Sequence, residues 1–235
     1  MSAAAVDARE LSYRYPDGTA GLEHVTFRLQ AGERVALLGA NGAGKSTLLL
    51  LLAGMLRGSG TLEIDGLPVN RRNLPEVRRR VGILFQDPDD QLFCPSVLED
   101  VTFGPANLGV APEAAHQRAM SALAQAGIAH LAHRPAHHLS LGEKRRAALA
   151  AVLSMEPTVL LMDEPTSSLD PRGRRELAHL LRGLDGTQLV ATHNLDFARR
   201  TCDRALVLLE KRLTYDGQLL PLLEREQDLE AWGLQ

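Results

Sequence analysis

Short runs of apolar residues recur along most of the chain, and each is followed by turn residues or by a longer helical stretch. Runs of this length predict strands, and their continuous apolar character is typical of a sheet that is buried on both faces. The alternation of these strands with helical segments indicates an α/β fold. The predicted strands are Arg34–Leu38, Thr61–Ile64, Val81–Phe85, Val159–Met162, Gln188–Ala191 and Ala205–Leu209.

Three other parts of the chain have different patterns. Residues up to about 33 alternate polar and apolar positions around turns that contain Gly and Asp, which predicts antiparallel strands. The alanine-rich residues 87–155 predict a helical insertion, and the leucine-rich segment beyond Tyr215 predicts a short amphipathic helix. We therefore expect one domain over residues 1–235, with an antiparallel β part at about 5–33 and 58–70, a core at 34–57, 71–86 and 156–210, a helical lobe at 87–155 and a tail at 211–235.

Composition narrows the class of protein. The 235 residues are 45% hydrophobic and 23% charged, which is typical of a globular domain. A net charge of −3 leaves no basic footprint for nucleic acid. The longest apolar run, Leu48–Leu56, is about half of the ~18 residues that would suggest a membrane span, and the first ten residues lack a secretory pattern. Cys94 and Cys202 lack metal-type spacing, which favours a reduced cytosolic protein.

The segment GANGAGKST lies directly between a predicted strand and a predicted helix, and it matches the phosphate-loop motif without a mismatch. Glycine at these positions lets successive backbone N–H groups converge on phosphate oxygens. Lys45 is expected to contact the β- and γ-phosphates, and the Ser46 hydroxyl is expected to bind Mg²⁺. The alternative is a glycine-rich turn without a ligand. The predicted nucleotide-binding residues of the loop are Gly39, Ala40, Asn41, Gly42, Ala43, Gly44, Lys45, Ser46 and Thr47.

The segment TVLLMDEP predicts a buried strand that ends in two adjacent carboxylates, Asp163 and Glu164. Adjacent side chains on a strand point to opposite sides. We expect Asp163 to hold Mg²⁺ and Glu164 to act as a general base toward water. The alternative is that these acids only cap a following helix.

A third segment, LSLGEKRR, carries no catalytic group but has the pattern of a helix start. Ser140 and Glu143 have the Ser-x-x-Glu spacing of a capping box. Because the N-terminus of a helix is a ready anion site, this segment raises the question of which anion it meets.

In their order along the chain, these segments resemble the nucleotide-binding subunits of ABC transporters. The resemblance covers about Tyr13 to Leu209 and includes SSLD (Ser167–Asp170) and ATHN (Ala191–Asn194). It implies a P-loop NTPase (ABC ATPase) core with an antiparallel β subdomain and a helical lobe. ATP and Mg²⁺ are the implied cofactors. The signature segment of one subunit would cover the γ-phosphate held by a like or related subunit, through Ser140, Gly142 and Glu143.

The resemblance also implies roles for single residues. Tyr15 would stack on adenine, although a core tyrosine of an edge strand is the alternative. Gln86 would approach Mg²⁺ and the attacking water. His193 would contact the γ-phosphate and hold Glu164 in place, whereas a structural histidine is the alternative. Asp170 would cross the dimer interface.

Residues 85–109, FQDPDDQLFCPSVLEDVTFGPANLG, resemble the ATP-binding subunits of energy-coupling-factor and cobalt-type importers. The implied function is an ATP-hydrolysing subunit at the cytoplasmic face of the membrane, which drives import of cobalt, nickel or a vitamin. An integral membrane subunit would dock near residues 86–105. Alternatives are a low-turnover regulatory ATP-binding module and a non-transport ABC ATPase. The apolar residues that could form a docking groove, or equally the core of the lobe, are Leu92, Phe93, Val97, Leu98 and Phe103.

Other enzyme classes fit less well. A GTPase would need an Asn-Lys-x-Asp motif, which the sequence lacks. A chromosome-maintenance ATPase would need a coiled-coil arm, and the interval between Ser46 and Ser140 is too short for it. A translation-factor ATPase would carry two cassettes.

Two features depart from this picture. Leu141 stands where the family usually has glycine, and it would be strained by about 1 kcal/mol if the backbone required a positive φ. We expect ordinary helical angles there, which leucine tolerates. The cluster of His130, His133, His137 and His138 could hold a transition metal, but a solvated connector is the interpretation we favour.

Overall fold

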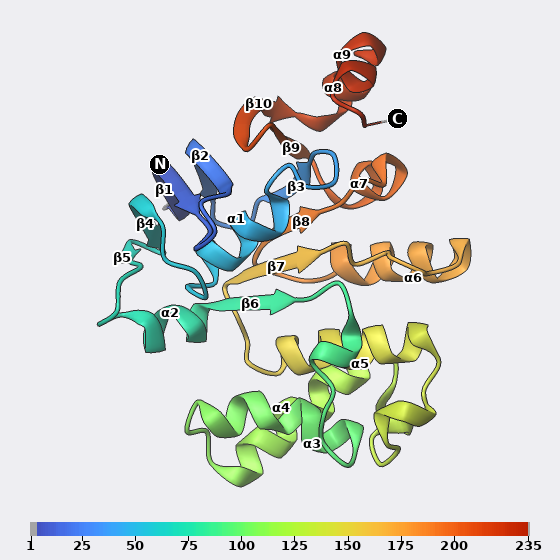
Figure 1. Cartoon of the computed structure of the whole chain (residues 1–235). Coiled ribbons are helices and arrows are strands. Elements are labelled where there is room, and N and C mark those ends of the chain that lie inside the picture. The colour runs from blue at the N-terminus through green and yellow to red at the C-terminus, as the bar shows by residue number, and fades with distance from the viewer. Residues whose placement is uncertain (1–3, 235) are drawn as a thin grey trace.

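The computed structural model describes residues 4–234, which form two sheets and the helices around them (Figure 1). The larger sheet has six strands in the order β10-β9-β3-β8-β7-β6, and all neighbours except β9 and β10 run parallel. The five predicted strands of this sheet are confirmed, with ends that differ by one residue at most. The observed strands are β3 (Arg34–Leu38), β6 (Val81–Leu84), β7 (Val159–Asp163), β8 (Thr187–Ala191), β9 (Arg204–Leu209) and β10 (Arg212–Gln218).

The second sheet is antiparallel, as the alternating pattern predicts. It has the order β2-β1-β4-β5, formed by β1 (Ala4–Arg14), β2 (Ala20–Gln30), β4 (Ser59–Ile64) and β5 (Leu67–Pro68). The predicted strand Thr61–Ile64 is thus confirmed as part of β4.

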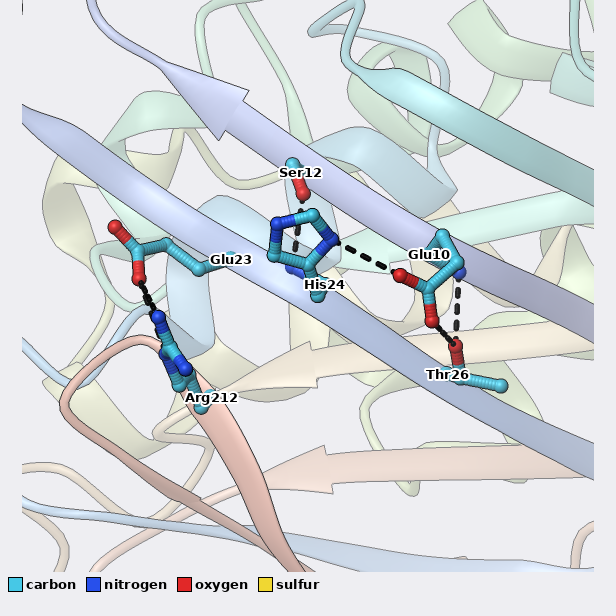
Figure 2. Close-up of polar contacts among 6 residues, drawn as sticks. All are labelled: Glu10, Ser12, Glu23, His24, Thr26 and Arg212. Carbon is cyan, nitrogen blue, oxygen red and sulfur yellow. Dashed lines mark hydrogen bonds and ion pairs between the residues drawn. The ribbon is translucent and has the colours of Figure 1, made fainter.

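Irregularities in β1 and β2 bring a group of polar side chains together on the outer face of this sheet (Figure 2). Glu10 and His24 both have φ of 51°, and the pairing of the two strands shifts between Ala8 and Leu11. Such bulges bend a strand and increase its twist. The His24 Nδ1 atom lies 2.9 Å from a Glu10 carboxylate oxygen, and the Thr26 hydroxyl accepts the Glu10 N–H at 2.8 Å.

The helix α1 (Lys45–Leu52) follows β3, and four of its five leucines are buried in an apolar core shared with both sheets. A second core joins the other face of the parallel sheet to the helical lobe, which carries no strand between residues 87 and 155, as predicted. The lobe contains α3 (Val97–Asn107), α4 (Pro112–Gln125) and α5 (Leu141–Leu153). The remaining helices before the tail are α2 (Leu74–Arg80), α6 (Pro171–Arg182) and α7 (Leu195–Thr201).

The tail differs from its prediction of one short helix. β10 continues to Gln218, because it pairs with β9 and alternates exposed and half-buried positions. Two helices follow, α8 (Leu219–Leu223) and α9 (Glu226–Ala231), which bury leucines in the second core. The leucine-rich pattern therefore reported burial correctly but missed the strand.

Among residues 4–234, no helix combines the length and the apolar character needed to cross a bilayer. The sequence analysis predicts that the first ten residues lack a secretory pattern. Residues 1–3 of this segment lie outside the described residues.

Candidate functional site

The phosphate loop connects the buried strand β3 to α1, as its motif predicts. Gly44 directly precedes α1 with φ of 105°, and no side chain caps this helix. A Cβ atom on Gly44 would lie 2.7 Å from the carbonyl oxygen of Gly21, so a larger residue would displace the backbone of β2. The first N–H groups of α1 are therefore left free for an anion.

Lys45 lies inside this loop and is only 7% exposed. Its ammonium donates hydrogen bonds to the carbonyl oxygens of Gly39, at 2.6 Å, and Ala40, at 3.2 Å. Burial lowers the pKa of Lys45, and the nearby carboxylates of Glu164 and Asp163 oppose that shift. The lysine is thus a buried cation that can exchange loop carbonyls for phosphate oxygens.

Asp163 ends β7 and lies beside the first turn of α1. Burial raises the pKa of its carboxyl group, whereas a hydrogen bond with Ser46 and the charge of Lys45 lower it. Carboxylate and hydroxyl oxygens are ligands that Mg²⁺ prefers, so Ser46 and Asp163 fit the predicted metal site.

Glu164 is 7% exposed and has φ of 44°, a strained conformation for a residue with a side chain. One of its carboxylate oxygens lies 2.9 Å from Nδ1 of His193, and the other accepts a hydrogen bond from the Thr192 hydroxyl at 3.3 Å. The structure thus brings the predicted base and histidine into direct contact. Sequence reasoning missed Thr192, although it lies within the ATHN segment.

Tyr15 lies next to the phosphate loop. Its hydroxyl is 2.8 Å from the Thr47 hydroxyl, and its ring contacts Tyr13 edge-to-face. Its ring is 37% exposed, so part of it is accessible to a base.

These groups line one cleft of about 370 Å³. Sequence reasoning missed Lys211, which also lines it and donates to the carbonyl oxygen of Gly42. Three predicted residues of the loop, Gly39, Ala40 and Ala43, do not line the cleft. The predicted residues that do line it are Tyr15, Asn41, Gly42, Gly44, Lys45, Ser46, Thr47, Gln86, Asp163, Glu164 and His193.

The remaining predicted contacts lie elsewhere. A separate cavity of about 700 Å³, which we call the signature face, is lined by Ser140, Gly142, Glu143 and Asp170. The Ser140 N–H and hydroxyl donate to the Glu143 carboxylate at 2.8 and 2.7 Å, so the predicted capping box is present. Asp170 caps α6 by accepting the N–H of Gly173 at 2.7 Å.

Leu141 is the first residue of α5, and its φ lies outside the left-handed region. The backbone therefore does not require glycine here, as expected. The side chain is 40% exposed.

The five apolar residues of the possible docking segment divide between the two alternatives. Leu92 and Val97 are buried, and Leu98 packs against the core of the lobe. Phe93 and Phe103 are 64% and 47% exposed, and their rings meet edge-to-face 5.0 Å apart.

The histidine-rich connector contains two short turns, at residues 129–131 and 136–138, and the rings of His137 and His138 contact each other. Over the described part of the chain, no three His, Cys, Asp or Glu side chains are grouped to hold a metal ion.

Comparisons with known proteins place this chain in one family. The family model described as ABC transporter matches residues 22–167. A Streptomyces avermitilis protein, named as an ABC transporter ATP-binding protein with no cargo in its name, is 50% identical and covers 100% of this chain and 90% of its own length. The energy-coupling factor transporter ATP-binding protein EcfA of Methanosphaera stadtmanae is 44% identical over 90% of this chain and 78% of its own.

The fold matches solved structures as well. The structure of cbiO1 from Clostridium perfringens, part of the ABC transporter complex cbiONQ, has a TM-score of 0.86 and 38% identity, with 100% of this chain and 96% of the other covered. A dimeric ATP-binding cassette bound to ADP and phosphate has a TM-score of 0.81 and 26% identity, with coverage of 91% and 98%. Together with the phosphate loop and the paired carboxylates that follow β7, these matches show that the chain belongs to the ABC transporter family of ATP-binding subunits.

Proposed function

We propose that this chain is the ATP-hydrolysing, energy-coupling subunit of a membrane importer for cobalt, nickel or a vitamin. The observation that carries the proposal is the division of the candidate ATP contacts between two surfaces. Lys45 and Glu164 line the cleft, whereas Ser140 and Gly142 line the signature face. One chain thus offers two half-sites, and a dimer of like or related chains would close MgATP between them.

In the cleft, the free N–H groups at the start of α1 and the Lys45 ammonium bind the phosphates. Ser46 and Asp163 would hold Mg²⁺ there, and Gln86, which lines the same cleft, would contribute to this site. Mg²⁺ supplies charge that balances the phosphate oxygens. Tyr15 stacks on adenine.

Glu164 accepts the proton of the attacking water. Thr192 and His193 each contact one oxygen of this buried carboxylate and hold it in place. His193 keeps that carboxylate in position and contacts the γ-phosphate. The signature face of the second chain, with Ser140, Gly142 and Glu143, covers the far end of the triphosphate, and Asp170 orients the opposite site. Loss of the γ-phosphate removes the bridge between the chains.

The membrane subunit docks near residues 86–105, at the cytoplasmic face of the membrane. Phe93 and Phe103 are exposed there. Shortly before Phe93 in sequence lie three exposed carboxylates, Asp87, Asp89 and Asp90. The names of EcfA and of the cbiONQ complex support a role in energy coupling for this chain.

The central test is Glu164→Gln, which keeps the size of the side chain but removes the base. We expect ATP binding to persist, turnover to fall by about 10² to 10⁴, and a dimer to accumulate with ATP. Steady-state phosphate release and size-exclusion chromatography measure these effects. Glu156→Gln is the control, because this carboxylate pairs with Arg118 on the surface. Wild-type turnover in Glu164→Gln would exclude Glu164 as the base.

The cargo requires a separate test. The chain is purified with its membrane partners, and uptake of cobalt, nickel and vitamins is measured in vesicles with and without ATP. A complex that accumulates none of these in an ATP-dependent manner would contradict the proposed cargo class.

A further inference from the structure

Arg145 is a buried cation that the proposed mechanism does not use. It lies in the second turn of α5 and is only 2% exposed. Its Nη2 atom donates to the carbonyl oxygen of Gln86 at 2.9 Å and to that of Ser167 at 3.2 Å. The Nε and Nη1 atoms are buried without a hydrogen-bond partner.

Stability alone does not explain an arginine at this position. No carboxylate of residues 4–234 forms an ion pair with Arg145, and burial lowers its pKa, with the charge of Asp87 opposing the shift. A buried charge without a paired carboxylate is costly, and an apolar side chain of similar volume is often equally stable or better. The adjacent Arg146 is different, because it is more exposed and pairs with Glu176.

The two carbonyl groups that Arg145 holds belong to segments next to the catalytic residues. Gln86 lines the nucleotide cleft, and Ser167 donates its N–H to the carbonyl oxygen of Glu164 at 3.0 Å. Arg145 itself stands five residues after Ser140, on the helix whose N-terminus forms the signature face. A single guanidinium therefore connects three separate segments.

A second contact fastens the same helix to the segment after Gln86. Lys144 and Asp89 form an ion pair with a distance of 2.7 Å. A cavity of about 490 Å³ runs beside these contacts, and its walls include Arg145, Asp87, Gln86 and Asp163. Asp87, in the acidic segment that follows Gln86, and Asp163, the carboxylate that ends β7, thus line the same cavity.

We propose that Arg145 is a positioning residue that couples the orientation of α5 to the backbone at Gln86 and Ser167. A displacement of the lobe, whether by a docked membrane subunit or by a second copy of this chain, moves both carbonyl groups together. The inference rests on the proposed function, since it assigns the regulation of that same site. The Nε and Nη1 atoms together carry three unpaired N–H bonds, which allow the guanidinium to change acceptors while one bond is kept.

The test uses the full chain with Arg145→Met and Arg145→Lys. Arg118→Met is the control, because Arg118 lies on α4 of the same lobe, pairs with Glu156 and lines neither the cleft nor the signature face. We expect Arg145→Met to lower kcat about tenfold to a hundredfold, because a small misplacement of catalytic groups has effects of this size. The affinity of the single chain for a fluorescent ATP analogue should stay within about twofold, because Arg145 lines the signature face but not the cleft. Tm should stay within about 3 °C of wild type. Arg145→Lys keeps the charge, but its ammonium does not reach as far as Nη2 of the arginine, so kcat should be intermediate.

Hydrogen exchange of the nucleotide-free chain provides a readout that does not need turnover. In Arg145→Met, amides of residues 85–90 and of residues 165–169 should both exchange faster, and Arg118→Met should leave both segments unchanged. Unchanged exchange in Arg145→Met, wild-type kcat, or an equal loss in Arg118→Met would overturn the inference. If the wild-type chain binds ATP but has no turnover, the proposed function fails, and exchange alone decides the role of Arg145.

Discussion

The N-termini of α1 and α5 are the two candidate anion sites of this chain, and they are built in opposite ways. α1 follows Gly44, has no side-chain cap and carries no acid in its first turn. α5 follows Ser140, which forms a complete capping box with Glu143. A small residue thus precedes each of the two helices, but of the two only α1 leaves its first N–H groups unpaired with a side chain.

This difference separates two roles. The start of α1 can bind phosphate by itself, because its donors are free and Lys45 lies inside the loop. At the start of α5, the Ser140 hydroxyl donates to the Glu143 carboxylate. It must give up this hydrogen bond before it can donate to a phosphate oxygen. In the proposed dimer, α1 would therefore bind nucleotide first, and α5 would engage only when a second chain presents a held triphosphate.

Among the variants that compare these two helix starts, the largest effect is expected at the start of α1. Lys45→Ala should weaken ATP binding by about 10- to 100-fold, because hydrogen bonds to charged groups contribute about 1.5–3 kcal/mol. Titration calorimetry or a fluorescent ATP analogue measures the affinity. Lys144→Ala is the control on α5 and should leave the affinity of the single chain unchanged. Equal affinities in wild type and Lys45→Ala would remove the contrast between the two sites.

The next largest effect is expected at the start of α5. Ser140→Ala should leave ATP binding to the single chain unchanged but lower turnover about tenfold or more, because one donor to the triphosphate is lost. Loss of the N-cap should also lower the free energy of unfolding by about 1 kcal/mol. Ser140→Thr keeps the hydroxyl and serves as the control. If Ser140→Ala binds ATP poorly as a monomer, the two sites are not separate.

A smaller effect is expected at Leu141, which lies between the two capping-box residues Ser140 and Glu143. Leu141→Gly should lower the free energy of unfolding by about 0.5–1 kcal/mol, because leucine already has allowed angles here and glycine disfavours the helix. Urea denaturation measures this change. An increase in stability would mean that leucine is strained at this position.

The smallest effect is expected at Glu143, as a pH dependence of the free energy of unfolding. Hydrogen bonds from the Ser140 hydroxyl and N–H lower the pKa of Glu143. The unfolded chain therefore binds this proton more readily, and the stabilisation is present above the ordinary glutamate pKa of about 4.3 and is lost as pH falls through the lowered pKa. Glu143→Gln should be slightly less stable than wild type near pH 7 and equal to it in acid. A urea midpoint difference that stays constant over this range would contradict the prediction.

The local features were predictable because each depends on neighbouring residues. The strand–loop–helix order around Lys45, the capping box at Ser140 and the strand that ends at Asp163 all follow from short patterns. The tail was predicted less well, because β10 forms only by pairing with β9. The exposure of Phe93 and the burial of Leu92 were open alternatives, since both belong to one apolar run.

The sequence by itself determined most of the elements, the phosphate loop and the position of two carboxylates at the end of β7, because hydrophobic period and motif spacing are local properties. Only the tertiary structure decided which of these groups meet. The contact of Glu164 with Thr192 and His193, the place of Lys211 in the cleft and the bridge from Arg145 to Gln86 and Ser167 join segments that lie far apart in the chain. The physical reason is that packing of the two cores sets these distances, and no local pattern encodes them.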